Sequence, residues 1–348
     1  MSSQLDTRFL SENEYDRWDN FVVCSPGGSI YNTCQYLDIL CEAVGGTFKV
    51  IAVTQNEEIV GGVALYEKRT RCGIYVDTRL LLFYNGVVLR EYDTKYPSQK
   101  TSRHLKIMAA LEEALSKAGC DSMRLKNRSC LTDVRVFQQH NWMVTLTYTY
   151  VVALDDIKST WDRIEQNQRR LVKRCEQQEM QISEGDDFDS LFRMHLEIHQ
   201  RKGAPLYMPY EQFKRYFERL RSNKLCRLYH ARLPDGKAVS SQLVLTCAHP
   251  VTHTVCAAAD ANHLNSGATT FLRWKAFEDL ARLGYTATDL TNASLSPVTR
   301  FKGQLGGDLQ ICLMLAKPGK RSYRMFRGLE DFLYKQKVSI TSMLSKSK

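Results

Sequence analysis

The chain has 348 residues, of which 43% are hydrophobic and 25% are charged. This composition is typical of a globular protein with a substantial core, and the length suits about two domains of ordinary size. No apolar run approaches the roughly 18 residues of a membrane-spanning helix, and the first residues lack the basic and apolar segments of a signal peptide. The 11 cysteines are scattered, which favours reduced thiols over a disulfide framework and indicates a cytoplasmic protein.

Most of the positive charge in excess lies near the end of the chain. The 48 Lys and Arg residues against 38 Asp and Glu residues give a net charge of +10. Residues 1–150 carry 17 of each sign, residues 151–316 carry 22 against 19, and residues 317–348 carry 9 against 2, a net of +7. Aromatic and aliphatic residues are interspersed in this last segment. Residues 321–348 are therefore expected to form a basic amphipathic tail, which suits an anionic membrane surface, RNA or its own domain.

The first half predicts a hairpin followed by a helix and a strand. Apolar strands at Lys49–Val53 and Ile59–Leu65 flank a polar turn. Apolar residues then recur at helical spacing over Leu105–Leu115, and the helix is expected to stop at Gly119, as a left-handed cap requires. A short strand at Ser122–Leu125 follows.

The second half repeats this order. Strands at Arg227–Ala231 and Ala238–Leu245 flank a Pro-Asp-Gly turn. A helical pattern covers Leu272–Leu283 and stops at Gly284, and the short strand Ala287–Leu290 comes next. The shared order and spacing indicate an internal duplication.

The duplication places a first domain at residues 1–150 and a second at residues 151–320. Each unit mixes strands and helices without the regular rhythm of a parallel doubly wound sheet, so a mixed α/β sheet repeated twice is expected. We see no low-complexity segment and no long linker, which favours tight packing of the two domains.

The second domain is expected to open with a helix from about Ser159 to Gln178, with Ser159 or Thr160 as its cap. Its run Arg169–Arg174 is strongly basic and forms either a solvated face or a contact with the phosphates of a substrate or nucleic acid. Further helices are predicted at about 187–200 and 211–221.

Both units end with the pattern Val, two residues, Phe, and the copies then differ. The first reads Val134–Gln138, whereas the second reads Val298–Lys302 and continues to Gly306-Gly307. Repeats preserve what folding needs, so the added lysine marks a functional position or a surface lysine. In acyl transfer, a fixed cation lowers the barrier by stabilising the oxyanion. Asp289 ends the strand before this loop and either orients or deprotonates an amine nucleophile, or caps the loop.

Two further features have both a functional and a structural interpretation. Asn265, Ser266 and Gly267 immediately precede the helix of the second unit, where exposed amides attract phosphate or carboxylate groups and where ordinary caps also occur. His195 and His199 lie one helical turn apart, but their surroundings lack the pattern of a zinc peptidase. No metal site is expected.

Taken together, these motifs resemble the Fem-type acyltransferases, which are tandem GNAT-like proteins, and the related acetyltransferase-like family of the GNAT superfamily. The resemblance covers about residues 15–315 and rests on the order and spacing of several segments. These are Trp18-Asp19-Asn20-Phe21-Val22, Gly28-Ser29-Ile30-Tyr31-Asn32-Thr33, Ile59-Val60-Gly61-Gly62, Arg169 with Val172-Lys173, Arg201-Lys202-Gly203-Ala204-Pro205, Asp289, Phe301-Lys302 and Gly306-Gly307.

The resemblance implies two tandem GNAT-like mixed-sheet domains and an N-acyltransferase. The lysine of the family's Phe-Lys pair, credited with stabilising the tetrahedral intermediate, corresponds to Lys302, with Phe301 beside it. Asp289 is the third candidate catalytic residue. Tyr36, Arg201 and Asn292 join the segment before the second helix as candidate substrate-binding residues.

The resemblance also implies that the donor is a co-substrate, acyl-CoA or aminoacyl-tRNA, and that no cofactor stays bound. Three hypotheses remain open. The first is transfer from acyl-CoA or a similar donor to a small-molecule or peptide amine. The second is a Fem-type peptidyltransferase that uses aminoacyl-tRNA and extends a peptidoglycan precursor of the cell wall. The third is a non-catalytic binding module derived from such an enzyme.

Overall fold

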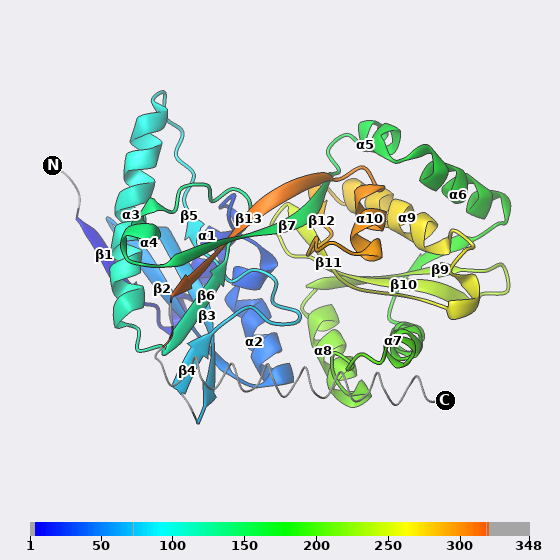
Figure 1. Ribbon diagram of the computed structural model, residues 1–348, viewed down its shortest axis with the longest axis horizontal. Coiled ribbons are helices and arrows are strands. Elements are labelled where there is room, and N and C mark those ends of the chain that lie inside the picture. Colours follow the sequence, from blue (N-terminus) through cyan, green and yellow to red (C-terminus); the bar gives the residue numbers. More distant parts are fainter. Residues whose placement is uncertain (1–3, 72, 318, 320–348) are drawn as a thin grey trace.

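Two halves of similar construction lie side by side and share one mixed sheet of 13 strands (Figure 1). The computed structural model describes residues 4–71, 73–317 and 319. The predicted α/β class is confirmed. The basic tail predicted at 321–348 lies outside the described residues, and the domain boundaries near 150 and 320 stay predictions.

The first half begins with an edge strand of the sheet and two helices. These elements are β1 (Leu5–Phe9), α1 (Tyr15–Val23) and α2 (Cys34–Val44), with short 3-10 helices at Glu12–Glu14 and Ile30–Asn32. The other strands and helices of this half follow as β2 (Thr47–Gln55), β3 (Glu58–Thr70), β4 (Gly73–Val76), β5 (Val88–Leu89), α3 (Pro97–Lys117), β6 (Ser122–Lys126), α4 (Arg135–Gln139) and β7 (Met143–Ala153).

The second half has more helices before its hairpin. It opens with α5 (Ile157–Arg163), α6 (Gln166–Gln177), β8 (Gln181–Glu184), α7 (Phe188–Lys202) and α8 (Tyr210–Ser222). It continues with β9 (Cys226–Arg232), β10 (Ala238–Leu245), β11 (Val251–Ala259), a 3-10 helix at Ala261–His263, α9 (Ala268–Arg282), β12 (Ala287–Asp289), α10 (Pro297–Gly303) and β13 (Asp308–Lys317).

The duplicated pattern is confirmed element by element. The hairpin β2–β3 corresponds to β9–β10, the helix α3 to α9, and the strand β6 to β12. Gly119 and Gly284 follow the two helices with φ angles of 75° and 90°, the left-handed conformation expected of C-terminal caps. Both Val-x-x-Phe segments start short helices, α4 and α10.

The long helix predicted from Ser159 to Gln178 is wrong, because the chain forms two helices there. Ile164 and Glu165 take extended backbone angles between α5 and α6. Ile164 is buried in the core, and the Glu165 amide donates to the carbonyl of Gln304 at 3.1 Å. The predicted caps are also wrong, since the side chain of Asp156 accepts the backbone N–H of Ser159. Tertiary contacts therefore override a continuous helical pattern.

The two halves exchange their last strands. β7, which ends the first half, pairs with β12 of the second half, while β13, which ends the second half, pairs with β6 of the first. β7 and β13 also pair with each other from Asp308 opposite Val151 to Ala316 opposite Met143. Figure 1 shows these two long strands crossing between the halves. The sheet is continuous for this reason.

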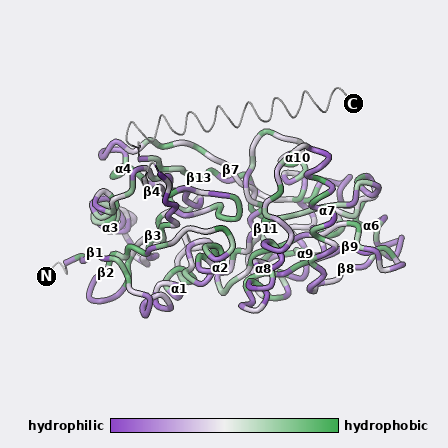
Figure 2. Tube along the Cα trace, turned by 90° about the horizontal axis from the view of Figure 1, so that it is seen from below, coloured by the Kyte–Doolittle hydropathy of each residue, from purple (hydrophilic) through white to green (hydrophobic). Residues whose placement is uncertain are grey.

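The hydrophobic core has one shared part and two local parts. On one face of the sheet, α1 and α2 pack with α7 and α8 in a single cluster that spans both halves. On the other face, α3 and α4 cover a cluster of the first half, and α5, α6, α9 and α10 cover one of the second. Figure 2 shows the outer helix α6 as largely hydrophilic, with hydrophobic residues along the interior strands.

Within the described part of the chain, no helix has both the length and the apolar character to cross a membrane.

Candidate active site

Lys302 lies in the last turn of α10, and its ammonium group is held by backbone carbonyls. Ser296 caps the start of this helix, and its hydroxyl accepts the N–H of Thr299 at 3.3 Å. The Nζ of Lys302 donates to the carbonyl of Thr291 and, at 2.9 Å, to the carbonyl of Asn292. Both acceptors belong to the loop that follows β12. The predicted residues Lys302 and Asn292 are therefore in contact.

The loop that receives Lys302 has an unusual backbone. Thr291 and Asn292 have φ angles of 48° and 55°, in the left-handed region. A β-branched residue is rare there, and such strain costs on the order of 1–3 kcal/mol per residue. The hydroxyl of Thr291 donates to the carbonyl of Thr254 on β11 at 2.7 Å, and its amide donates to Asp289 at 2.7 Å. These bonds and Lys302 together hold the conformation.

Partial burial makes Lys302 easier to deprotonate than an exposed lysine. Its pKa falls from the ordinary value of 10.5 to about 8, first because of desolvation and then because of the charge of Arg273; Asp289 acts in the opposite direction and Lys126 lowers the pKa further. The side chain is therefore mainly a cation below pH 8, and it readily loses its proton when the pH rises above that value.

We expect Lys302 to react as a lysine with a pKa of about 8. Competitive acetylation of the folded protein with trace acetic anhydride, followed by mass spectrometry, measures this directly. The reactivity of Lys302 should reach half its maximum near pH 8, while exposed lysines in the same digest continue to gain reactivity up to a pH of about 10. If the ammonium is the active form, turnover should fall as the pH rises through that value. If the reactivity of Lys302 reached half its maximum only above pH 10, burial would not lower its pKa as we expect.

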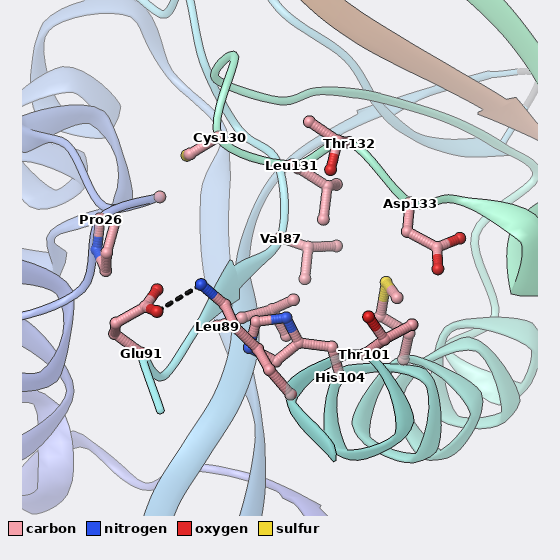
Figure 3. A pocket seen from close by; sticks show the side chains of 13 residues that line it. Pro26, Val87, Leu89, Glu91, Thr101, His104, Cys130, Leu131, Thr132 and Asp133 are labelled. Carbon is pink, nitrogen blue, oxygen red and sulfur yellow. Dashed lines mark hydrogen bonds and ion pairs between the residues drawn. The ribbon is translucent and has the colours of Figure 1, made fainter. Parts of the chain in front are cut away.

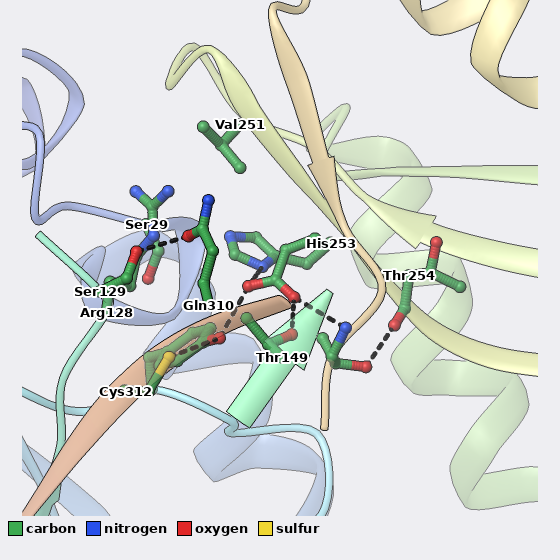
Figure 4. Close-up of polar contacts among 12 residues, drawn as sticks. Ser29, Arg128, Ser129, Thr149, Val251, His253, Thr254, Gln310 and Cys312 are labelled. Atoms are coloured by element: carbon green, nitrogen blue, oxygen red, sulfur yellow. Dashed lines mark hydrogen bonds and ion pairs between the residues drawn. The ribbon is translucent and has the colours of Figure 1, made fainter. Parts of the chain in front are cut away.

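Asp289 is buried, with 1% of its surface exposed, and accepts three hydrogen bonds. Its Oδ1 accepts the hydroxyl of Thr149 on β7 at 2.5 Å and the amide of Thr291 at 2.7 Å, while its Oδ2 accepts the hydroxyl of Tyr84 at 2.7 Å. Tyr84 and Thr149 come from the first half of the chain, so both halves build this cluster. Figure 4 shows Thr149 and His253 near Cys312, where the exchanged strands meet. The carboxylate is well placed to fix the loop.

Buried aromatic rings connect this cluster with Tyr36. The ring of Tyr31 lies 4.9 Å from His253, 6.0 Å from Tyr84 and 5.5 Å from Tyr36. The hydroxyl of Tyr36 contacts the carbonyl of Leu81 and, at 2.9 Å, the hydroxyl of Tyr216 on α8. Tyr36 is fully buried and joins α2 to α8. It belongs to the interior network behind the loop rather than to the surroundings of Lys302.

Beside the Lys302 loop, the strands β11 and β12 separate. They pair in parallel only from Val251 opposite Ala287 to His253 opposite Asp289. The next residue of β11 is Thr254, which pairs with Val244 of β10, and the register between β10 and β11 shifts at this pair. Among the described strands, none pairs with β11 on this side beyond His253. There the carbonyl of Thr254 accepts the hydroxyl of Thr291 from the loop. Phe301 packs on the core below and positions α10.

The segment before α9 is held by contacts with α6, with Asn265 exposed, Ser266 half-buried and Gly267 buried. The hydroxyl of Ser266 accepts the amide of Ala268 at 3.1 Å, and the guanidinium of Arg174 donates to the carbonyls of Asn265 at 3.0 Å and Ser266 at 2.6 Å. A side chain at Gly267 would meet Leu171 at 3.0 Å. The basic run of α6 therefore supports this turn with Arg174, while Arg170 and Lys173 are exposed.

Arg201 is exposed near the end of α7, which packs on the opposite face of the sheet from α9. The structure does not bring it together with Lys302. His195 lies on the same helix and contacts the thiol of Cys256 at 3.6 Å. Within the described residues, no group of three or more His, Cys, Asp or Glu side chains is placed to hold a metal ion.

A pocket of about 180 Å³ lies in the first half, between the start of α3 and the loop before α4 (Figure 3). An ion pair between Glu91 and Lys100 borders it, and His104 and Met108 of α3 form part of its wall. None of the predicted site residues lines this pocket. It occupies the part of the first unit that corresponds to the surroundings of α9 and α10 in the second.

The sequence interpretation missed the residues that surround Asp289 and Lys302. Tyr84 and Thr149 gave no signal, because their role depends on the exchange of strands between the halves. Arg273 on α9 did give a signal in the sequence, because it is a charged residue among the apolar positions of that helix. Aligning α3 and α9 from their terminal glycines places Met108 at the position of Arg273.

Comparisons with known proteins agree with this architecture. Residues 159–302 match the sequence model of the acetyltransferase (GNAT) domain family. No curated protein matches the chain by sequence.

Solved structures with the same fold match over most of the chain. The crystal structure of FemX has a TM-score of 0.71 at 11% sequence identity, covering 89% of this chain and 96% of that chain. L-PGS from Bacillus licheniformis has a TM-score of 0.53 at 12% identity, covering 88% and 98%. A tandem GNAT protein from the clavulanic acid biosynthesis pathway has a TM-score of 0.51 at 13% identity, covering 91% and 100%.

The fold is therefore that of the tandem GNAT-like proteins, with both units present in one chain. Residues 159–302 of the second half match the acetyltransferase (GNAT) domain model, and the chain as a whole shares the fold of FemX. The resemblance predicted from the sequence is confirmed.

Proposed function

We propose that this protein is an N-acyltransferase, in which Lys302 stabilises the tetrahedral intermediate formed when an amine attacks an activated acyl group. The observation that carries the proposal is the half-buried ammonium of Lys302 beside a strained loop, within the domain that matches the acetyltransferase (GNAT) family. The domain match supports acyl transfer in general, while the donor and acceptor are part of the proposal.

The chemical step follows from this placement. The amine nitrogen attacks the acyl carbon, a C–N bond forms, and the carbonyl electron pair moves to the oxygen. The ammonium of Lys302 would contact this oxyanion, where a preorganised cation lowers the barrier most. The C–S bond of a thioester, or the C–O bond of an ester, then breaks, and the departing group takes up the proton that the amine loses. Asp289 would act by holding Thr291, because its two oxygens already accept three hydrogen bonds.

Acyl-CoA is the donor that we propose first. The separated edge of β11 offers backbone groups to an extended chain such as the arm of CoA, and it lies against the Lys302 loop through the contact of Thr291 with Thr254. Calorimetric titration of the purified protein with acetyl-CoA tests this, followed by measurement of thiol release in the presence of a panel of small-molecule and peptide amines. Saturable binding and amine-dependent release would support the proposal.

A second candidate is a Fem-type peptidyltransferase that uses aminoacyl-tRNA and adds amino acids to a peptidoglycan precursor. The observation in its favour is the agreement with FemX over nearly the whole chain, together with the exposed Arg170 and Lys173 on α6. Binding to RNA through such cations weakens as salt rises. Preference for charged over uncharged tRNA at moderate salt, without binding of acetyl-CoA, would select this function. A binding module without catalysis would show neither amine-dependent release nor dependence on Lys302.

A further inference from the structure

Arg273 is a buried cation on α9. It lies on α9 with 8% of its surface exposed, and its Nη1 atom is buried without a hydrogen-bond partner. Among the described residues, no carboxylate forms an ion pair with it. Burial lowers its pKa to about 10, and the thiol of Cys256 acts in the opposite direction. A guanidinium stays charged at neutral pH, so the protein carries the cost of an unpaired buried charge.

The position of Arg273 on its helix directs it toward α10. Thr270, one turn earlier on α9, donates to the side chain of Gln168 at 2.7 Å, and Gln168 donates to Gln304 at the end of α10 at 3.0 Å. Thr269 contacts Ser240 of β10 at 3.4 Å. Residues three and four positions apart share one face of a helix, and their side chains lean toward its start. Arg273 follows Thr269 and Thr270 by one helical turn, on the side of α9 that faces β10 and α10.

Arg273 and Lys126 are two buried cations whose charges act on Lys302. The charge of Arg273 acts on Lys302, whose pKa it lowers. Among the described residues, Asp289 is the acidic group that acts on Lys302, against the two cations Arg273 and Lys126. The region therefore has positive charge in excess, and the Nη1 donor of Arg273 has no hydrogen-bond partner within the described part of the chain.

The first half of the chain shows what folding alone requires at these positions. Counted back from the terminal glycines of α3 and α9, Arg273 corresponds to Met108, which is fully buried in an apolar cluster. Counted from the phenylalanine of each Val-x-x-Phe segment, Lys302 corresponds to Gln138. The unit therefore folds with neutral residues at both places. The second unit has cations at both.

We propose that Arg273 and Lys302 form a binding site for an anionic oxygen group, a carboxylate or a phosphate, carried by the substrate of the second unit. A planar guanidinium and an ammonium are the side chains that bind such groups best. The assignment of this anion to the substrate rests on the proposed acyltransferase function. It concerns binding alone, however, and can be tested without any turnover.

The experiment compares the wild-type protein with Arg273→Met and Lys302→Gln, which introduce the residues of the first unit. Met108→Leu serves as a matched control, because it changes the corresponding helix without changing charge. Inorganic phosphate and acetate are titrated at constant ionic strength with chloride as the background anion. The fluorescence of Trp274, the neighbour of Arg273 in the chain, and calorimetry report binding.

The wild type and Met108→Leu are expected to bind at least one of the two anions saturably. Arg273→Met and Lys302→Gln should each weaken this binding about tenfold or more, the usual effect of losing one hydrogen bond to a charged group. The melting temperature of Arg273→Met should equal or exceed that of the wild type, since a buried unpaired charge has been removed. Phosphate binding alone would indicate a phosphorylated substrate, and acetate binding alone would indicate a carboxylate.

Equal anion binding by the wild type and Arg273→Met would overturn the inference, as would binding of neither anion by the wild type. A lower melting temperature of both Arg273→Met and Arg273→Gln, with unchanged binding, would make Arg273 a structural residue. The proposed function fails separately. A protein that binds phosphate through Arg273 but has no transferase activity would contradict the function and leave the anion site in place.

Discussion

Replacing Lys302 with alanine is expected to lower the turnover number about 100- to 1,000-fold, the usual loss when one donor to an oxyanion is removed. The ammonium lies beside the strained Thr291–Asn292 loop and is bound to its carbonyls. The free energy of unfolding should change by no more than about 1 kcal/mol, because the loss of those bonds is offset by the release of a desolvated charge.

The measurement is the initial rate with saturating acetyl-CoA and the best amine acceptor, alongside thermal unfolding of the same samples. Gln138→Ala is the matched control, since this exposed residue takes the place of Lys302 in the first unit. It should leave the rate unchanged. Lys302→Arg, which keeps the charge, should recover part of the lost rate. Turnover by Lys302→Ala at the wild-type rate would remove Lys302 from the mechanism.

Replacing Asp289 with alanine should destabilise the protein by about 3–5 kcal/mol. The substitution leaves three buried donors without an acceptor, the hydroxyls of Tyr84 and Thr149 and the amide of Thr291. Each unsatisfied buried polar group costs about 1–3 kcal/mol. Because Tyr84 and Thr149 belong to the first half, the effect should extend to the packing between the halves. Denaturant unfolding followed by tryptophan fluorescence measures it.

Asp289→Asn separates the two roles of this residue. The amide oxygen still accepts hydrogen bonds from Thr291 and Thr149, and the amide nitrogen can donate to Tyr84, so this variant should lose only about 1 kcal/mol. If Asp289 positions the loop, Asp289→Asn retains most of the turnover. If it accepts the proton of the amine, the variant folds normally and is inactive. A stable Asp289→Ala protein would contradict the structural role.

The sequence predicted the local elements of both units well. Apolar periodicity and turn residues located the hairpins β2–β3 and β9–β10, and the terminal glycines located α3 and α9. These features depend on residues close together in the chain, for which hydrophobic periodicity and the conformational preference of each residue decide the structure. The difference between Gln138 and Lys302 also pointed to the loop that holds Asn292. The tertiary role of a lysine cannot be read from spacing, however, because it depends on the backbone conformation of Thr291.

The remaining features depend on contacts between distant segments. The break between α5 and α6 has no proline or glycine to announce it and follows from the burial of Ile164 and the bond from Glu165 to Gln304. The exchange of β7 and β13 leaves no trace in local pattern, because each strand has the same alternation whichever partner it pairs with. The cluster around Asp289 could therefore not be assembled from sequence.

The exchanged strands also determine the order in which this protein can be completed on the ribosome. β7 emerges before β12, its partner in the second half, and β6 waits for β13, where Lys126 pairs with Met314. Until then both strands have open edges, which readily pair with other chains. The nascent first half therefore cannot close its sheet, and completion requires contacts of long sequence separation, which form slowly. Assembly of the Asp289 cluster thus becomes a late event in synthesis, and an unfinished chain cannot present the Lys302 site.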